Sequence, residues 1–127
     1  MKKIVLLLSI LIIFSCNDKE EDNYIVPINN ISACECDDPL NQLEWLNEIA
    51  NKALIDKTGN YQGNIWIVSQ EATDYIITDM MLGSGGVYHY YFDCSGDLIT
   101  IPDEQFMNNI ESALVDSNMI FSTVYKK

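Results

Sequence analysis

The chain has 127 residues, and 19 acidic residues against 7 lysines and no arginine give it a net charge of −12 at pH 7. So acidic a chain would repel nucleic acid, and we expect no nucleic-acid ligand. Without arginine the chain also lacks the planar donor groups that hold phosphate, so we expect no phosphate ligand. Neutral sugars, cations and other proteins remain as partners.

The N-terminal segment has the layout of a secretory signal. Two lysines precede an apolar run of about a dozen residues, which is too short to span a bilayer as a helix, and a small residue precedes Cys16. Residues 13–16 (IFSC) resemble a bacterial lipobox. The resemblance implies that residues 1–15 are a removed signal peptide and that Cys16 is acylated as the first residue of the mature chain. The ordinary alternative is a cleaved signal followed by a chance cysteine.

Lipid at Cys16 would anchor the protein to a membrane, because each buried methylene contributes about 0.8 kcal/mol. The next residues, 17–22 (NDKEED), are too polar to order themselves and predict a tether. They also resemble the export signal by which Bacteroidota send lipoproteins to the outer face of the outer membrane. Taken as physics alone, the same charges keep the tether hydrated and away from anionic lipid. We therefore predict an outer membrane lipoprotein, at the cell surface or on the periplasmic face.

The mature chain is long enough for one domain and too short for two. Removal of the signal peptide leaves 5 lysines against 19 acidic residues. We assign residues 1–15 to the signal peptide, 16–33 to an acidic tether and linker, and 34–127 to a single domain. Pro27 favours linker structure towards the end of the second segment, with one extended stretch as the alternative.

Three cysteines follow the lipid attachment site, in a compartment where disulfides persist: Cys34, Cys36 and Cys94. A bridge between Cys34 and Cys36 would strain a very small ring, so we predict that Cys94 pairs with either Cys34 or Cys36. Closing a loop of about sixty residues stabilises the fold by about 4 kcal/mol in the chain-entropy model. The third thiol has no role in this prediction.

Residues 37–54 form the clearest helix in the sequence. Asp38 is suited to cap the free amides, and Pro39 fits the first helical position. Apolar residues recur every three to four positions, so one face of the helix must pack on another element. These residues are Leu43, Leu46, Ile49 or Ala50, and Ala53 or Leu54.

Three short motifs resemble a group of small, uncharacterised lipoproteins of Bacteroidota. They are PLxxLxWL at residues 39–46, YxG at residues 61–63 and YxDCxG at residues 91–96, and together they extend over most of the mature chain. That group often carries a cysteine near the first strand, whereas residues 61–70 contain none. The resemblance supports the lipoprotein prediction and implies no activity.

After the helix the sequence takes the period of strands. Residues 61–68 alternate and predict a strand with one face more buried than the other. Residues 75–81 are rich in isoleucine and threonine and predict a second strand. Residues 87–92 predict a third strand, which turns at residues 93–97 into a hairpin with residues 98–101.

The last part of the chain predicts a short helix and one more strand. Phe106, Ile110 and Leu114 stack at spacings of four in the helix, and residues 119–125 form the strand. The predicted fold class is α+β. An N-terminal helix packs on an antiparallel sheet of four or five strands, a short C-terminal helix precedes the last strand, and the two helices cover one face of the sheet.

His89 is the only histidine, and a lone histidine in a strand is usually structural. Val87 and Tyr91 lie on its face of the predicted strand. With the three domain cysteines it would complete a Cys3His zinc site. Against this, the Cys-x-Cys spacing is tighter than usual and an oxidising compartment favours disulfides. The acidic residues 18–22 and 35–38 lack the alternation and central glycine of a calcium loop. We therefore predict no metal site and no cofactor.

Known catalytic motifs are absent from the sequence, including the nucleophile elbow, the HExxH helix and the phosphate loop. Asp103 and Glu104 are a carboxylate pair for a glycosidase, yet adjacent side chains do not define a cleft. We predict no catalytic residue and no enzyme. Trp66, Tyr88 and Tyr90 are the candidate ligand-binding residues, because aromatic surface on a sheet can stack against a sugar or contact a protein; the ordinary role of such residues is core.

The leading hypothesis for function is a lipid-anchored cell-envelope protein that acts as a non-catalytic binding or interaction module. Its partners would be the membrane, through the covalent lipid, and a protein or a neutral glycan. The alternative is a small glycan-acting hydrolase or a neutral-glycan-binding surface lipoprotein. The residues do not identify the ligand.

Overall fold

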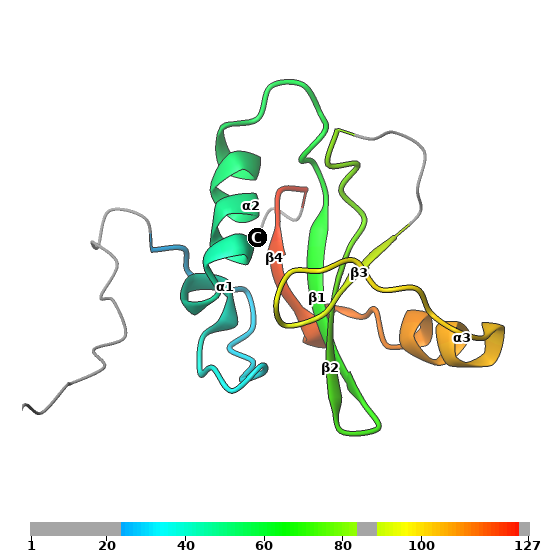
Figure 1. Cartoon of the computed structure of the whole chain (residues 1–127). Helices are drawn as coiled ribbons and strands as arrows, with labels where there is room; N and C mark the ends of the chain where they lie inside the picture. Colours follow the sequence, from blue (N-terminus) through cyan, green and yellow to red (C-terminus); the bar gives the residue numbers. More distant parts are fainter. Residues whose placement is uncertain (1–23, 84–88, 125–127) are drawn as a thin grey trace, which may run out of the picture.

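A computed structural model describes residues 24–83 and 89–124 (Figure 1). The elements in chain order are α1 (Pro39–Gln42), α2 (Glu44–Ile55), β1 (Asn64–Gln70), β2 (Thr73–Thr78), β3 (Tyr90–Phe92), α3 (Glu104–Ser112), the 3-10 turn η2 (Asp116–Asn118) and β4 (Met119–Ser122). Helices and a four-stranded antiparallel sheet make an α+β domain, which confirms the predicted class. Within the described ranges, no helix is long and apolar enough to cross a bilayer.

The sheet has the strand order β3-β2-β1-β4, so β1 and β2 occupy its centre. A two-residue turn at Glu71 and Ala72 joins them, and both residues have positive φ angles, of 52° and 60°. Such a turn matches the twist of the flanking strands. Both edges of the sheet are partly covered, because the Ile99 N–H donates to Tyr91 beside β3 and the Ile28 N–H donates to Ile120 in β4. Covered edges give other chains little to pair with.

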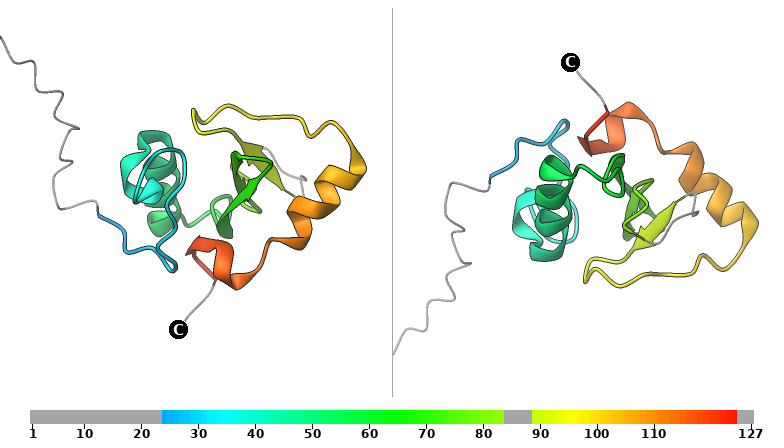
Figure 2. Two further views of the ribbon diagram at one scale, coloured as in Figure 1. Left: turned by 90° about the horizontal axis from the view of Figure 1, so that it is seen from below. Right: turned by 90° about the horizontal axis from the view of Figure 1, so that it is seen from above.

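The two longer helices lie on opposite sides of the sheet (Figure 2). The chain leaves β3 at one edge and returns as β4 at the other, so the segment that contains α3 has to cross one face. We call that side the α3 face and the other side the α2 face. The prediction that both helices cover one face is therefore wrong. The physical reason is that the segment between β3 and β4, which contains α3, crosses the face opposite to α2, and the sequence does not reveal this path.

Each face of the sheet has its own hydrophobic cluster. On the α2 face, Leu46 and Ala50 of α2 are buried in one cluster with Ile65, Ile67 and Ile76 of the sheet. The cluster on the α3 face consists of the buried residues Trp66, Val68, Ile77, Tyr91, Ile110 and Met119. Since four consecutive residues of β1 are buried, the expectation that one of its faces is more exposed is also wrong. A central strand covered on both sides has this continuous apolar pattern.

Part of the segment that was predicted as linker contacts the domain. Ile25 is buried on the α2 face, and its backbone exchanges hydrogen bonds of 2.8 and 2.7 Å with the side-chain amide of Asn41. The Asn29 side chain donates to the carbonyl oxygens of Asp116 and Met119, at 2.6 and 2.7 Å. Residues 25–29 are therefore held along the folded unit at several points.

Two local features differ from the sequence prediction. The first helix is broken at Leu43, whose φ and ψ of −84° and 110° are extended, and the Asp38 side chain accepts from Asn41 instead of capping a backbone amide. Residues 98–101 do not form a fifth strand, because Leu98 makes only an isolated bridge with Phe92. Pro102 then removes a backbone donor where a longer ladder would need one.

Candidate functional site

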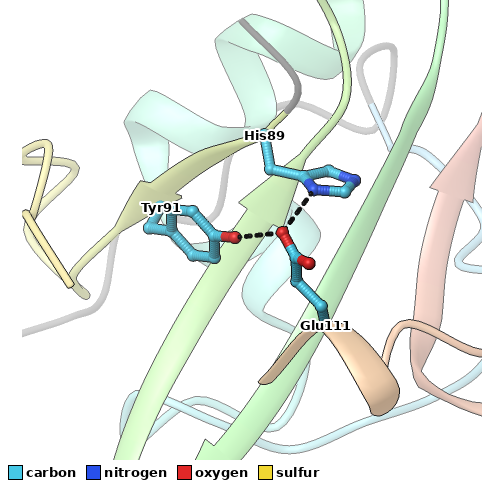
Figure 3. A network of polar contacts seen from close by, with 3 residues as sticks. All are labelled: His89, Tyr91 and Glu111. Carbon is cyan, nitrogen blue, oxygen red and sulfur yellow. Dashed lines mark hydrogen bonds and ion pairs between the residues drawn. The ribbon is translucent and has the colours of Figure 1, made fainter. Parts of the chain in front are cut away.

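A polar cluster of His89, Tyr91 and Glu111 lies where β3 meets α3 (Figure 3). His89 directly precedes β3 and Tyr91 lies within it, so the two side chains are two residues apart and point to the same side of the sheet. Glu111 reaches them from the C-terminal half of α3. We refer to these three residues as the His89–Tyr91–Glu111 cluster.

One carboxylate oxygen organises this cluster. The Tyr91 hydroxyl donates to Oε1 of Glu111 at 3.0 Å, and Nδ1 of His89 lies 3.4 Å from the same atom. Burial, followed by the hydrogen bond to Glu111 and the negative charge of Glu111, raises the pKa of Tyr91 to about 12. Tyr91 is therefore a neutral donor at physiological pH. The side chains of His89 and Glu111 remain 24% and 40% exposed, so both are within reach of a ligand.

Trp66 lies next to this cluster, and its indole N–H has no hydrogen-bond acceptor among the described residues. Its ring meets the ring of His89 edge to face, with centroids 6.1 Å apart. The side chain is only 7% exposed, and Nε1 has no hydrogen-bond partner among the described residues. A buried donor without an acceptor costs about 1–3 kcal/mol. A region that tolerates such a cost is unusual in a purely structural core.

The predicted ligand-binding aromatics do not lie on one surface. Trp66 belongs to the cluster on the α3 face, whereas Tyr90 packs against the cluster on the α2 face. Successive residues of a strand point to opposite sides, so Tyr91, and not Tyr90, shares the side of Trp66. Tyr88 is outside the described residues, as is the predicted lipidation site Cys16. Ligand binding by Trp66, Tyr88 and Tyr90 stays a prediction.

Sequence reasoning placed Tyr91 on the same side as His89 but missed Glu111. The spacing of two residues in a strand was the available signal for the first pair. No comparable signal exists for Glu111, because the face on which α3 packs depends on how the chain crosses the sheet. Of the carboxylate pair considered in the sequence, Asp103 and Glu104, the first has a structural role. Asp103 caps α3 by accepting a 2.7 Å hydrogen bond from the Phe106 N–H.

A disulfide joins Cys34 to Cys94, which selects one of the two predicted pairings. Cys36 lies outside this bond, and its thiol donates to the Cys34 carbonyl at 3.4 Å. The Cys3His zinc arrangement is not formed, because two of its sulfurs are bonded to each other. Its histidine instead contacts Trp66 and the cluster around Glu111.

The residues of two sequence motifs meet around this disulfide. The Trp45 indole N–H donates to the Cys94 carbonyl at 3.0 Å, and its ring lies 5.2 Å from that of Phe92. A Cβ atom at Gly96 would lie 2.7 Å from two carbons of the Trp45 ring. Trp45 of the helix motif and the DCxG turn therefore contact each other on the α2 face.

No family model, no curated protein and no solved structure matches the chain. The His89–Tyr91–Glu111 cluster offers a partly exposed carboxylate and an imidazole, which are groups that accept hydrogen bonds from hydroxyl or amide groups. It lies on the side of the sheet away from the disulfide and the Trp45 contact.

Proposed function

We propose that the protein is a lipid-anchored cell-envelope protein whose domain is a non-catalytic binding module, with the His89–Tyr91–Glu111 cluster in its binding surface. The lipobox-like residues 13–16 and the acidic residues after Cys16 support the anchor. The resemblance to small lipoproteins of Bacteroidota supports placement in the outer membrane. Packing of the N-terminal helix on the sheet, as its apolar stripe predicts, belongs to the same proposal and is supported by the buried side chains of Leu46 and Ala50.

The observation that carries the proposal is how residues 25–34 are fixed to the domain. Ile25 is hydrogen-bonded to Asn41, Ile28 to β4 and Asn29 to the first residue of η2, and Cys34 is covalently joined to Cys94. These attachments involve elements far apart in the sequence, on both sides of β1. Residues 25–34 are therefore part of the folded domain, and the predicted tether is confined to the residues before them, which suits a compact binding module held close to its proposed anchor.

The binding surface fits a neutral, hydroxyl-rich or amide-bearing partner. Glu111 still has the lone pairs of its second carboxylate oxygen, and His89 has a second ring nitrogen that is not part of its contact with Glu111. The strongly negative net charge disfavours an anionic partner. A neutral glycan or the surface of another envelope protein meets these requirements.

The anchor is tested by Cys16→Ala in the full chain. We expect the parent protein to incorporate labelled fatty acid and to stay with the membrane fraction, and the variant to lose the label and leave the membrane fraction or remain unprocessed. Cys36→Ser is the matched control, since it removes a cysteine without removing the proposed lipid site. Membrane association and labelling that are unchanged in Cys16→Ala would contradict the proposal.

The binding module is tested against its alternative, a glycan-acting hydrolase, with one set of neutral glycans and model glycosides. We expect binding without turnover, and weaker binding in Glu111→Gln. Glu104→Gln is the control carboxylate change, because Glu104 lies at the other end of α3. If the parent protein hydrolyses a glycan and Glu111→Gln abolishes that hydrolysis, the hydrolase hypothesis is right and the non-catalytic module is wrong. Equal binding by the parent and Glu111→Gln would remove the cluster from the binding surface.

A further inference from the structure

A second group of ligand-type side chains lies at the disulfide, outside the cluster described above. Atoms of three half-buried residues, the sulfurs of Cys34 and Cys94 and a carboxylate oxygen of Asp74, lie within 4.8 Å of one another. They come from three places in the chain: a turn before α1, the turn after β3, and the beginning of β2. As a disulfide the two sulfurs are not metal ligands, but as thiolates they would join the carboxylate in offering ligand types that bind zinc.

Hydrogen bonds fix the Asp74 carboxylate in this group. One of its oxygens accepts from the Cys34 N–H at 2.7 Å, and the other accepts from the Ser69 hydroxyl. Neither bond uses a sulfur atom. The carboxylate is thus held beside the two cysteines by contacts that would remain after the disulfide is broken.

The two cysteines are also positioned by more than their mutual bond. Cys34 lies in a tight turn closed by two backbone hydrogen bonds between Ala33 and Cys36, of 3.0 and 2.9 Å. In the turn that carries Cys94, the Asp93 carboxylate accepts from two backbone N–H groups, at 2.9 and 3.0 Å. Trp45 holds the Cys94 carbonyl. The backbone of each cysteine is therefore positioned by contacts that do not use the disulfide bond.

We propose that reduction of the Cys34–Cys94 disulfide creates a binding site for a thiophilic divalent cation of the zinc class, held by Cys34, Cys94 and Asp74. A dithiol reductant supplies two electrons and two protons and is itself oxidised to a disulfide, while the Cys34–Cys94 bond breaks to give two thiols. The cation then binds both sulfurs as thiolates and releases the two thiol protons. A water molecule completes four-coordination, as it does where zinc has three protein ligands.

The spacing of the group suits this ligand geometry. Tetrahedral zinc with bonds of about 2.3 Å to sulfur holds its two sulfurs about 3.8 Å apart. The sulfurs are bonded to each other in the structure, so they have to move apart on reduction to reach this spacing, while the Asp74 oxygen already lies within 4.8 Å of both. Two thiolates beside a carboxylate repel one another, and a divalent cation removes that repulsion. Cys36 lies two residues from Cys34, but its sulfur is not part of the group.

Cobalt(II) is the probe, because thiolate ligands give it strong charge-transfer absorption in the near ultraviolet. The mature protein is reduced with a phosphine, freed of reductant without oxygen, and titrated with cobalt. We expect one cobalt per chain with thiolate charge transfer, displacement of cobalt by zinc, and no such absorption from the oxidised protein. An equal signal from oxidised protein would overturn the proposal, and so would binding by a reduced chain whose circular dichroism shows it to be unfolded.

Variants identify the ligands. Asp74→Asn should weaken cobalt binding by about tenfold or more, in line with the loss of one of three ligands, while Glu71→Gln, a carboxylate change in the nearby turn, should leave it unchanged. Cys94→Ser should abolish the charge-transfer signal, and Cys36→Ser should preserve it. Loss of the signal in Cys36→Ser, or equal affinity in Asp74→Asn and the parent, would show that this ligand set is wrong.

Discussion

Two tryptophans, one on each face of the sheet, are in opposite situations. Trp45, on the α2 face, donates its indole N–H to the Cys94 carbonyl and contacts Gly96 and Phe92. Trp66, on the α3 face, is buried with its N–H lacking a partner among the described residues. In Trp45, both the indole N–H and the ring therefore take part in contacts that hold the fold together. Trp66 lies beside the His89–Tyr91–Glu111 cluster, in which the second carboxylate oxygen of Glu111 and the second ring nitrogen of His89 lie outside the contacts within the cluster.

The difference extends to the two faces as a whole. The α2 face carries the disulfide, the contact of Trp45 with the Cys94 turn, and the buried residue Ile25, which precedes the first helix. The α3 face carries the His89–Tyr91–Glu111 cluster among its apolar side chains. Protein cores rarely keep polar groups unpaired or half-exposed without a reason in function. We infer that the α2 face mainly provides stability and that the α3 face can change at lower cost.

The largest expected effect is loss of the disulfide on the α2 face. Cys34→Ser and Cys94→Ser should each lower the free energy of unfolding by about 4 kcal/mol, because each removes the same loop closure. Thermal unfolding should shift by about 15 °C or more. Cys36→Ser is the control and should shift it far less, since Cys36 is outside the bond. Equal losses in all three variants would mean that the pairing is not specific to Cys34.

The next effect comes from Gly96→Ala, on the same face. The added methyl group would clash with the Trp45 ring, and φ at Gly96 is +86°. Gly59→Ala is a matched control, because φ at Gly59 is +88° and its Cβ would meet nothing within 4 Å. We expect losses of about 3 kcal/mol for Gly96→Ala and about 1 kcal/mol for Gly59→Ala in urea unfolding, the difference being the clash. Equal losses would show that Trp45 does not pack on this turn.

The sequence predicted the elements that have strong local signals. The apolar stripes of α2 and α3 and the strand character of β1, β2 and β3 follow from the spacing and type of their apolar residues. It left the disulfide partner open, because the choice depends on a turn in which Cys34 and Glu35 both have positive φ, of 54° and 58°. Non-glycine residues seldom adopt that conformation, so no composition signal marks it.

The sequence could not predict what depends on the path of the chain across the sheet. The β1–β2 turn uses Glu71 and Ala72 in place of the Asn-Gly or Asp-Gly that would have revealed it. The face chosen by α3 decides that Glu111 meets His89 and Tyr91, and no local pattern encodes that choice. The sequence therefore indicated the relation between His89 and Tyr91, but it did not indicate the contribution of Glu111.

A smaller effect is expected on the α3 face from Tyr91→Phe. The lost hydrogen bond should cost about 1 kcal/mol at neutral pH. The folded-state pKa of Tyr91 is raised from 10 to about 12, so its proton stabilises the fold fully below pH 10, and this share is lost as the pH rises towards 12. Urea unfolding across that window should show a shallower decline in the variant than in the parent. Parallel declines would mean that Tyr91 is not held by Glu111.

The inference that the two faces differ in role is tested most directly by the free energy of unfolding of Glu111→Gln measured beside that of Cys34→Ser. Glutamine keeps the shape of Glu111 and can still accept from Tyr91, so we predict a change within about 1 kcal/mol, against a loss of about 4 kcal/mol for the disulfide variant. A loss in Glu111→Gln as large as that in Cys34→Ser would show that the cluster holds the fold together, and would contradict the account.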